Sequence, residues 1–330
     1  MSLKKKLFML QKLRDDFLAP KNRFTIPRDL TSTELRHYYF IFQEKNVINK
    51  DQKLISKFDD NGIPINKTYI DVTDQDYVYF PISIGQMGLA VYHTWLQTDS
   101  ETDKVRFLNF AEWFKDNAEI TAELGARWLT DVPLPQYKNP GPWQSAFAQS
   151  RAISILLRGY QLAGDLKYLE LAEQALIPFT YSVEEGGVTS YTEWGPFYEE
   201  YTASVPTLVL NGMIFSLFGV YDFIRVFPEN INAKNIFKTG IETLEKILPQ
   251  YDLGFWSRYN LCKADWYPNI DPATIRYQRL HIAQLKVLHR LTGKEIFRTY
   301  WQKFRKQDNL PSALRMYQLK FKALKKIGRL

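Results

Sequence analysis

Apolar residues recur at helical spacing in four consecutive pairs of segments, which occupy most of the chain after residue 80. The first segment of each pair is apolar on nearly all sides, as in AISILL and GMIFSLFGVY, whereas the second is amphipathic, as in KNIFKTGIETLEKIL. Apolar positions three and four residues apart are typical of a helix with one solvent-facing side. The expected helical pairs are 82–97 with 105–118, 143–163 with 167–179, 207–225 with 233–248, and 278–292 with 295–307.

These pairs suggest hairpins arranged in two layers. Helices that are apolar all round would form an inner ring, and the amphipathic helices would cover them as an outer ring. We therefore expect a mainly α fold, an incomplete (α/α) toroid of about four helical hairpins, with a small α+β N-terminal segment and inserted β-hairpins. The expected organisation is an accessory segment at 1–76, the toroid at 77–310 and a basic amphipathic helix at 311–330.

The segments outside the helical pairs carry their own signals. The sequence TSTE, Thr31 to Glu34, matches a capping box and predicts the start of a helix. The stretches TYIDV and YVYFPISI predict strands, with turns at DDNG and DQD. The stretch YSVEEGGVTSYTEW predicts a β-hairpin within residues 181–201, between the second and third helical pairs.

An amide side chain occurs early in each expected inner helix, at Gln86, Gln149, Asn211 and Gln284. A buried amide is costly unless it is hydrogen-bonded. Two interpretations follow from this requirement. The amides tie loops to helix ends, or some of them face a polar cleft along the toroid axis.

The composition is that of a globular protein, because 45% of its 330 residues are hydrophobic and 15% are aromatic. A single cysteine, Cys262, excludes an internal disulfide framework. The net charge of +7 is concentrated at the two ends, since residues 1–14 and 312–330 contain many lysines and arginines but no acid. The body between them is negative, so we expect no binding of nucleic acid, which requires a basic face.

The two basic ends bear on localisation. The N-terminal MSLKKKLFMLQKLRDD lacks the long apolar core of a signal peptide, and we expect a bacterial, cytoplasmic protein. In the C-terminal tail, apolar residues from Leu314 to Ile327 alternate with lysines at helical spacing. This helix either packs on the outer ring or lies on an anionic surface, where it would give peripheral contact with the inner membrane. The sequence leaves the oligomeric state open, a homodimer included.

The candidate chemistry points to tyrosines rather than to metals or cofactors. The four histidines lack the spacing of a zinc helix, and no phosphate loop, dinucleotide fingerprint or GxSxG elbow occurs, so we expect neither metal nor cofactor. Instead, Tyr198, Tyr201, Tyr259 and Tyr277 precede or open inner helices, which would gather them at one end of the arc. A tyrosine that caps a helical core with its hydroxyl in water needs no function, so each of them also has this simpler interpretation.

Several blocks carry a family resemblance. The blocks EEY with TASVPTLVLNGMIFSLFGVYDF, QYD before GFWSRYNL, RYQRLHIAQL, YFPISIGQMGLAVY and PWQSAFAQSRAIS resemble the C-terminal domain of the D-glucuronyl C5-epimerases of heparan sulfate and heparosan biosynthesis. Together they cover roughly residues 77–307. The resemblance implies an (α/α) toroid that inverts C5 of glucuronate within an acidic polysaccharide to give iduronate. It places the family's catalytic tyrosines on Tyr201, Tyr259 and Tyr277, and its acid on Glu200.

One departure from the family concerns the cation for the substrate carboxylate. Where the family has an arginine after the second tyrosine, this chain continues with Asn260, Leu261, Cys262 and Lys263. The cation is therefore expected at Lys263 or at a neighbouring arginine. The full expected substrate-binding set is Arg258, Lys263, Arg276, Arg279, His281, Asn211, Gln149, Gln86, Trp143 and Tyr198.

The chemistry explains why a cation and tyrosines would occur together. Removing the C5 hydrogen beside a carboxylate builds negative charge, so the site needs a cation and a base on each face of the sugar. A phenol is a weak base at neutral pH unless cations favour its phenolate. A polysaccharide lyase would use the same proton abstraction, and a non-catalytic glycan-binding protein would use tryptophans such as Trp143, Trp194 and Trp256 as a stacking platform. Both remain alternatives at this point.

Overall fold

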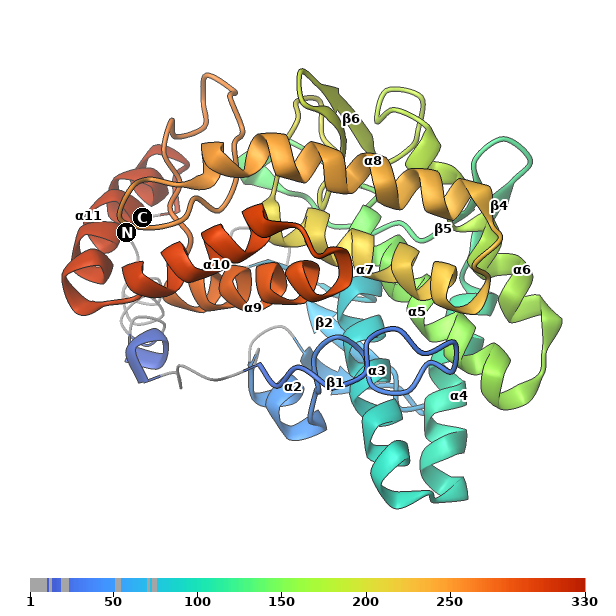
Figure 1. Cartoon of the computed structure of the whole chain (residues 1–330). Helices are drawn as coiled ribbons and strands as arrows, with labels where there is room; N and C mark the ends of the chain where they lie inside the picture. Colours follow the sequence, from blue (N-terminus) through green and yellow to red (C-terminus); the bar gives the residue numbers. More distant parts are fainter. Residues whose placement is uncertain are drawn as a thin grey trace.

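The computed structural model describes residues 11, 14–18, 24–50, 55–69, 72 and 76–329. Between residues 81 and 307, eight helices form the four expected hairpins (Figure 1). The pairs are α3 (Pro81–Thr98) with α4 (Glu101–Asp116), α5 (Ala146–Ala163) with α6 (Leu166–Gln174), α7 (Leu210–Val226) with α8 (Ile231–Ile247), and α9 (Ile275–Thr292) with α10 (Glu295–Gln307).

The first helices of the hairpins form the inner layer. Helix α5 packs between α3 and α7, and α7 also packs on α9, whereas each second helix packs on its own partner. Inner helices are buried along most of their length, while α4, α6, α8 and α10 bury one stripe each. The expected helical toroid with inserted hairpins is confirmed.

Close packing of α5 on α7 depends on one glycine. A side-chain carbon at Gly219 would come within 2.4 Å of the Ser150 oxygens, so only glycine lets the two helices approach this closely. The Ser150 hydroxyl donates to the carbonyl of Phe215 at 2.6 Å and accepts from the Gly219 amide at 3.0 Å.

Three small antiparallel sheets accompany the helices. Strands β1 (Ile55–Phe58), β2 (Pro64–Lys67) and β3 (Tyr77–Val78) form one sheet, in which Ile55 pairs with Asn66 and Lys67 with Tyr77. The expected turn at DDNG joins β1 to β2. The hairpins β4 (Glu119–Thr121) with β5 (Gly125–Arg127) and β6 (Thr189–Thr192) with β7 (Gly195–Tyr198) are inserted between helices, the second of them where it was expected. The other helices are the short α2 (Glu44–Lys50), η1 (Pro135–Tyr137), η2 (Ile177–Thr180) and η3 (Leu248–Tyr251), and the long C-terminal α11 (Leu310–Lys326).

Two local expectations at the N-terminal side are wrong. No helix begins at Thr31, because the Asp29 carboxylate accepts the amides of Thr31 and Ser32 and holds the chain in a bend. The stretch YVYFPISI forms only the short strand β3, since Pro81 starts helix α3 at a position that suits proline. The expected strand TYIDV also fails at Thr68 and Tyr69, while Ile70 and Asp71 lie outside the described residues.

Residues 24–43 seal one end of the arc. Three consecutive side chains of this irregular segment, Tyr38, Tyr39 and Phe40, are completely buried in the same core as the inner helices. Neighbouring residues of the segment bond to side chains near the C-terminal ends of all four inner helices: His93, Arg158, Gln161, Asp222, Arg225 and Arg290. Because the inner helices run in the same direction, their N-terminal ends are left to gather at the opposite end.

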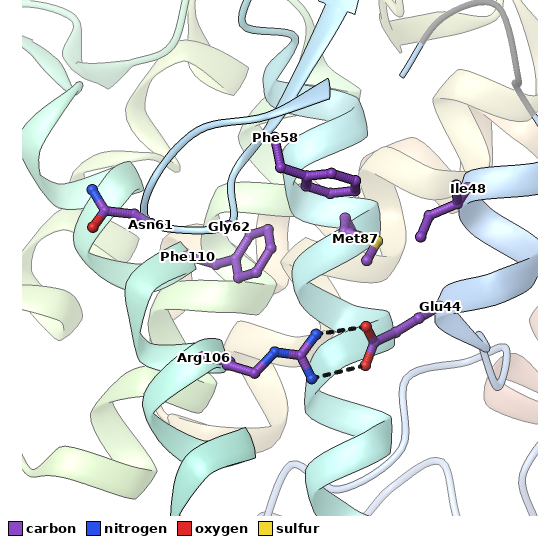
Figure 2. Close-up of a pocket in the computed structure, with 8 residues that line it drawn as sticks. All are labelled: Glu44, Ile48, Phe58, Asn61, Gly62, Met87, Arg106 and Phe110. Atoms are coloured by element: carbon purple, nitrogen blue, oxygen red, sulfur yellow. Dashed lines mark hydrogen bonds and ion pairs between the residues drawn. The ribbon is translucent and has the colours of Figure 1, made fainter. Parts of the chain in front are cut away.

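The next part of the N-terminal segment packs on the first hairpin. Figure 2 shows Arg106 of α4 paired with Glu44 of α2. Both terminal guanidinium nitrogens donate to the carboxylate, at 2.7 and 3.3 Å. The pair borders a cavity of about 230 Å³ whose apolar wall includes Phe58, Met87 and Phe110. This cavity is lined by α2, the β1–β2 hairpin, α3 and α4, which are not the elements that carry the tyrosines.

Candidate active site

The loops that precede the inner helices meet in a second hydrophobic cluster at the N-terminal ends of those helices. Its members come from before α3 (Phe80), before α5 (Tyr137 and Trp143), before α7 (Tyr201) and before α9 (Tyr267). Of the tyrosines expected to converge, Tyr201 lies in this cluster, whereas Tyr198 lies in the main core with the inner helices.

Three tyrosines and one acid lie together at this end. The rings of Tyr259 and Tyr277 meet edge to face with centroids 5.0 Å apart. Burial raises the pKa of Tyr201 well above its usual range, and the nearby Glu200 carboxylate and Tyr277 raise it further. Burial, Tyr201 and Glu200 likewise raise the pKa of Tyr259. The phenols of Tyr201 and Tyr259 are accordingly protonated at neutral pH.

The Glu200 carboxylate is fixed at the start of α7. Its Oε2 accepts a hydrogen bond of 2.9 Å from Nδ2 of Asn211, and the side chain is only 4% exposed. A side-chain carbon at Gly212 would come within 2.3 Å of Glu200 Cβ, so the glycine makes room for the acid. A carboxylate at the first turn of a helix is also favoured by the helix dipole.

The loop that carries Tyr201 is braced by a second acid, Glu199. Its carboxylate accepts hydrogen bonds from the amides of Thr207 and Leu208 and from the hydroxyls of Thr207 and Ser190. Leu208 has a φ of 50°, a conformation that costs free energy in a residue other than glycine. The bond from the Leu208 amide and a bond from the Tyr251 hydroxyl to its carbonyl hold this conformation. Burial raises the pKa of Glu199 to about 7 despite these donors.

A chain of polar contacts lies behind the tyrosines. The amide of Asn260 donates to the hydroxyls of Tyr137 and Tyr267 at 2.9 and 2.8 Å. The Tyr267 hydroxyl donates to Asp271 Oδ2 at 2.8 Å, and Lys320 Nζ donates to Asp271 Oδ1 at 2.6 Å. The same Nζ lies 5.6 Å from the centre of the Tyr259 ring. This chain connects the loop before α5, the loop before α9 and helix α11.

The sequence analysis missed Tyr137, Tyr267, Asp271 and Lys320. Residue type alone could not single out Tyr137 and Tyr267, because the chain contains 20 tyrosines. Lys320 carried no signal of its own, because its neighbours assign it to a basic tail.

Comparison with known proteins identifies the family of this site. A family described as D-glucuronyl C5-epimerase C-terminus matches residues 124–306, which is more than half of the chain and includes all three tyrosines. The chain belongs to the D-glucuronyl C5-epimerase family. It is 32% identical over 228 residues to D-glucuronyl C5-epimerase of Caenorhabditis elegans, covering 65% of this chain and 37% of that protein. It is also 29% identical over 182 residues to an uncharacterized protein of Methanocaldococcus jannaschii, covering 54% of this chain and 56% of that one. The chain thus matches little more than half of one curated relative and about a third of the other.

Of the four cations expected to bind the carboxylate in this epimerase-family chain, two form ion pairs with other residues. Arg276 pairs with Asp16 at 3.0 Å, and Arg279 pairs with Asp308 at 2.9 Å. Arg258 donates to the carbonyl of Asn269 at 2.9 Å. Lys263 is exposed, with its Nζ 5.8 Å from the centre of the Trp194 ring.

Three other expected substrate-binding residues lie in the interior rather than at the tyrosine cluster surface. His281 is completely buried and bonded to the Ser257 hydroxyl, and burial lowers its pKa to about 3, so the ring is neutral. The Tyr198 hydroxyl donates to the carbonyl of Ile236 in α8. Gln149 donates to the carbonyls of Ala126 and Ala175 and accepts from the Trp128 amide.

Of the remaining expected residues, Trp143 and Asn211 contact Tyr201 and Glu200, whereas Gln86 contacts a neighbouring helix. Trp143 packs edge to face on Tyr201 at 5.2 Å and donates its Nε1 proton to the carbonyl of Val132. Asn211 holds Glu200, as described above. Gln86 accepts a long bond of 3.5 Å from Arg151. Gln149 follows the first interpretation, in which the amides tie loops to helix ends. Gln284 instead donates to the carbonyl of Asn211 in the first turn of α7 and so joins two inner helices.

Neither a metal centre nor a membrane span is found in the part of the chain that the structure describes. Within it, no group of three acidic, histidine or cysteine side chains could hold a metal ion. None of its helices combines the length and the apolar character needed to cross a bilayer.

Proposed function

We propose that the chain epimerises glucuronate residues at C5 within an acidic, heparosan-like polysaccharide and so produces iduronate residues. The observation that carries this proposal is the meeting of Tyr201, Tyr259, Tyr277 and Glu200 at one end of the arc. Membership of a family named for C5 epimerisation supports it. The name of the nematode relative, D-glucuronyl C5-epimerase, points the same way.

The arrangement suits a two-base mechanism. Tyr201 comes from the loop before α7, Tyr259 from the loop before α9, and Tyr277 from the first turn of α9, so three separate segments supply the phenols. In the proposed reaction, a phenolate on one side takes the C5 proton, and the electron pair of the C5–H bond delocalises into the adjacent carboxylate. A neutral phenol on the other side then donates a proton to the opposite face of C5. The sugar is inverted, no bond of the polymer is broken, and the two phenols have exchanged protonation states.

Glu200 would act through the tyrosines. Its negative charge raises the pKa of Tyr201, which favours the neutral phenol and therefore its role as a proton donor. The tyrosine that acts as the base on the other side would need a lower pKa, which a nearby cation would provide by favouring the phenolate.

The experiment is incubation of the purified chain with heparosan-like polymer in heavy water. Deuterium at C5 of both uronate epimers, in a polymer of unchanged length, is the expected result. Shortened chains with a new unsaturated-uronate absorbance would instead indicate a lyase. Polymer binding without either signal would favour a glycan-binding protein and contradict the proposal.

A further inference from the structure

Lys320 of α11 is a cation that lies beside the tyrosine cluster. Its Nζ lies 2.6 Å from Asp271 Oδ1 and 5.6 Å from the centre of the Tyr259 ring. The lysine side chain is 16% exposed and that of Asp271 is 6% exposed, so the pair lies at the edge of the buried cluster. An ammonium has three hydrogens to donate, and this bond to Asp271 uses one of them.

Helix α11 is fixed so that Lys320 reaches this position. Its Ala313 and Met316 pack with Trp256 and Ile275, next to the start of α9. Farther along, Ile327 packs on the cluster that contains Tyr201. Figure 1 shows α11 beside the loop that precedes α9.

Asp271 orients Lys320 without belonging to the tyrosine set. Its other oxygen accepts from Tyr267, whose hydroxyl also accepts from Asn260. The Asp271 carbonyl accepts from the Tyr259 amide at 2.8 Å, so the same residue positions both the lysine and the tyrosine.

We propose that Lys320 binds the carboxylate of the glucuronate residue whose C5 lies at Tyr259, so that α11 completes the substrate site. This inference rests on the proposed function and names a residue for it outside the matched family region, which ends at residue 306. Asn260 to Lys263 stand where the family's arginine is expected. Arg276 and Arg279 pair with Asp16 and Asp308, whereas Lys263 is exposed beside Trp194, and no contact with the tyrosine rings is seen for these three among the described cation–ring contacts. A lysine supplied from the C-terminal helix would replace that charge.

The physical role of Lys320 is twofold. Its ammonium would neutralise the substrate carboxylate, into which the electron pair moves when the C5 proton leaves. At 5.6 Å from the Tyr259 ring it would also favour the phenolate of that tyrosine. Both effects lower the free energy of the same step, the abstraction of the C5 proton.

The test is a cycle that combines a change in the protein with a change in the ligand. Lys320→Met and wild type are each measured for binding to heparosan-like polymer and to the same polymer with its carboxyl groups reduced to alcohols. If Lys320 holds the carboxylate, Lys320→Met weakens binding of the acidic polymer about tenfold or more and leaves binding of the reduced polymer nearly unchanged. The matched control is Lys322→Met, because Lys322 is an exposed lysine of the same helix.

Turnover gives the second measurement. Lys320→Met should lower kcat/KM for C5 exchange about 10²- to 10³-fold, and Lys320→Arg should retain most of it, because arginine keeps the charge. A thermal melt of each variant reports folding. If Lys320→Met does not fold, Lys320→Cys is alkylated with bromoethylamine to restore an amine. Wild type treated in the same way serves as the control for the buried Cys262.

The outcomes separate this inference from the proposed function. Wild type could catalyse exchange while Lys320→Met has equal effects on binding of the two polymers, or no effect on either. This result would contradict the inference but not the proposed function. Lys320→Met could weaken binding of the acidic polymer alone while wild type shows no exchange. Lys320 would then still be a residue that binds the carboxylate, but the proposed epimerisation would be contradicted. If neither carboxylate-dependent binding through Lys320 nor C5 exchange by wild type is observed, the inference and the proposed function are both contradicted.

Discussion

At the scale of single residues, the hydroxyl groups of three tyrosines distinguish the proposed chemistry from ordinary packing. Tyr201→Phe, Tyr259→Phe and Tyr277→Phe should each fold normally and lose about 10²- to 10⁴-fold in turnover, because each change removes an acid or a base but little volume. Steady-state C5 exchange measures the loss.

Tyr198→Phe is the matched control for these variants. Its hydroxyl bonds to the carbonyl of Ile236 inside the fold, so its loss should cost about 1 kcal/mol of stability and leave turnover near the wild-type value. Near-normal exchange by all three catalytic variants on a confirmed substrate would refute the assignment.

The ionisation of the same tyrosines predicts the pH dependence of exchange. Burial raises the pKa of Tyr259, and the neighbouring Tyr201, Glu200, Tyr277 and Tyr137 raise it further. The Lys320 ammonium lies beside its ring. A higher pH increases the fraction of phenolate, so kcat/KM should rise between pH about 6 and about 8, by up to about tenfold per unit. A rate that falls over this range would point to a base with a low pKa, such as a carboxylate.

Sequence reasoning located part of the site because the relevant residues adjoin strongly apolar helices. Tyr201, Tyr259 and Tyr277 were noticed in this way, whereas their catalytic role and Glu200 came from the family resemblance, and the structure brings the four residues together. It could not locate Lys320, which lies more than forty positions from Tyr277 and reaches the cluster only through the packing of α11. It also counted His281 and Tyr198 among the binding residues, because the side a helix residue faces depends on neighbours that one sequence does not display.

At the scale of secondary-structure elements, the helices were predictable and the irregular segments were not. The four hairpins follow from runs of apolar residues long enough to specify helices. The capping-box prediction at Thr31 failed because tertiary contacts determine the conformation of residues 24–43, whose consecutive aromatic side chains are all buried. A helix would turn some of those side chains away from the core.

Helix α11 has an exposed outer face as well as a buried face, and the spacing of its apolar residues did not distinguish the two. Leu310, Leu314 and Phe321 are 62%, 54% and 59% exposed, although Ile327 faces the tyrosine cluster. The exposed lysines and arginine of this helix are Arg315, Lys322, Lys325 and Lys326. We propose that this outer face of α11 binds an anionic lipid surface, because it joins apolar side chains with cations and contains no acid.

Cosedimentation with vesicles tests the lipid-binding proposal. Each cation near such a surface contributes about 1 kcal/mol, so binding to vesicles with anionic lipid should be reversible and should weaken as salt is added. The variant Leu314→Ser with Phe321→Ser should bind less, and Lys320→Met, which changes the inner face, should bind like wild type. Equal binding to anionic and neutral vesicles, or none to either, would exclude this role.

At the scale of the whole molecule, one buried ion cluster joins the sealing segment to the inner helices. Asp222 of α7 pairs with Arg158 of α5 at 2.8 Å and with Arg225 at 3.1 Å, and it accepts a bond from Tyr39 of the segment 24–43. Burial alone would raise the pKa of Asp222, but Arg158 and Arg225 lower it below its usual value. The carboxylate therefore stabilises the fold above the usual carboxyl pKa of 3.8, and this contribution is lost as the pH falls through the lower folded-state pKa.

Removal of this carboxylate gives a stability prediction. Asp222→Ala should lower the free energy of unfolding by about 3 to 5 kcal/mol, because it leaves two buried guanidinium groups without their partner. Chemical denaturation measures the change, and Asp103→Ala, which breaks a more exposed pair with Arg106, should have a much smaller effect. An equal loss in the two variants would mean that the buried cluster does not hold the sealing segment in place.

The whole molecule therefore has one sealed end and one end that gathers tyrosines, and the central claim is that C5 chemistry occurs at the second. The most direct test follows the C5 proton of glucuronate residues by NMR while the polymer is incubated in heavy water with wild type or Tyr259→Phe. The account predicts that wild type replaces this proton with deuterium as iduronate signals grow, and that Tyr259→Phe does so at least about 100-fold more slowly. An unchanged C5 signal with wild type, or loss of the proton at the same rate with both proteins, would contradict it.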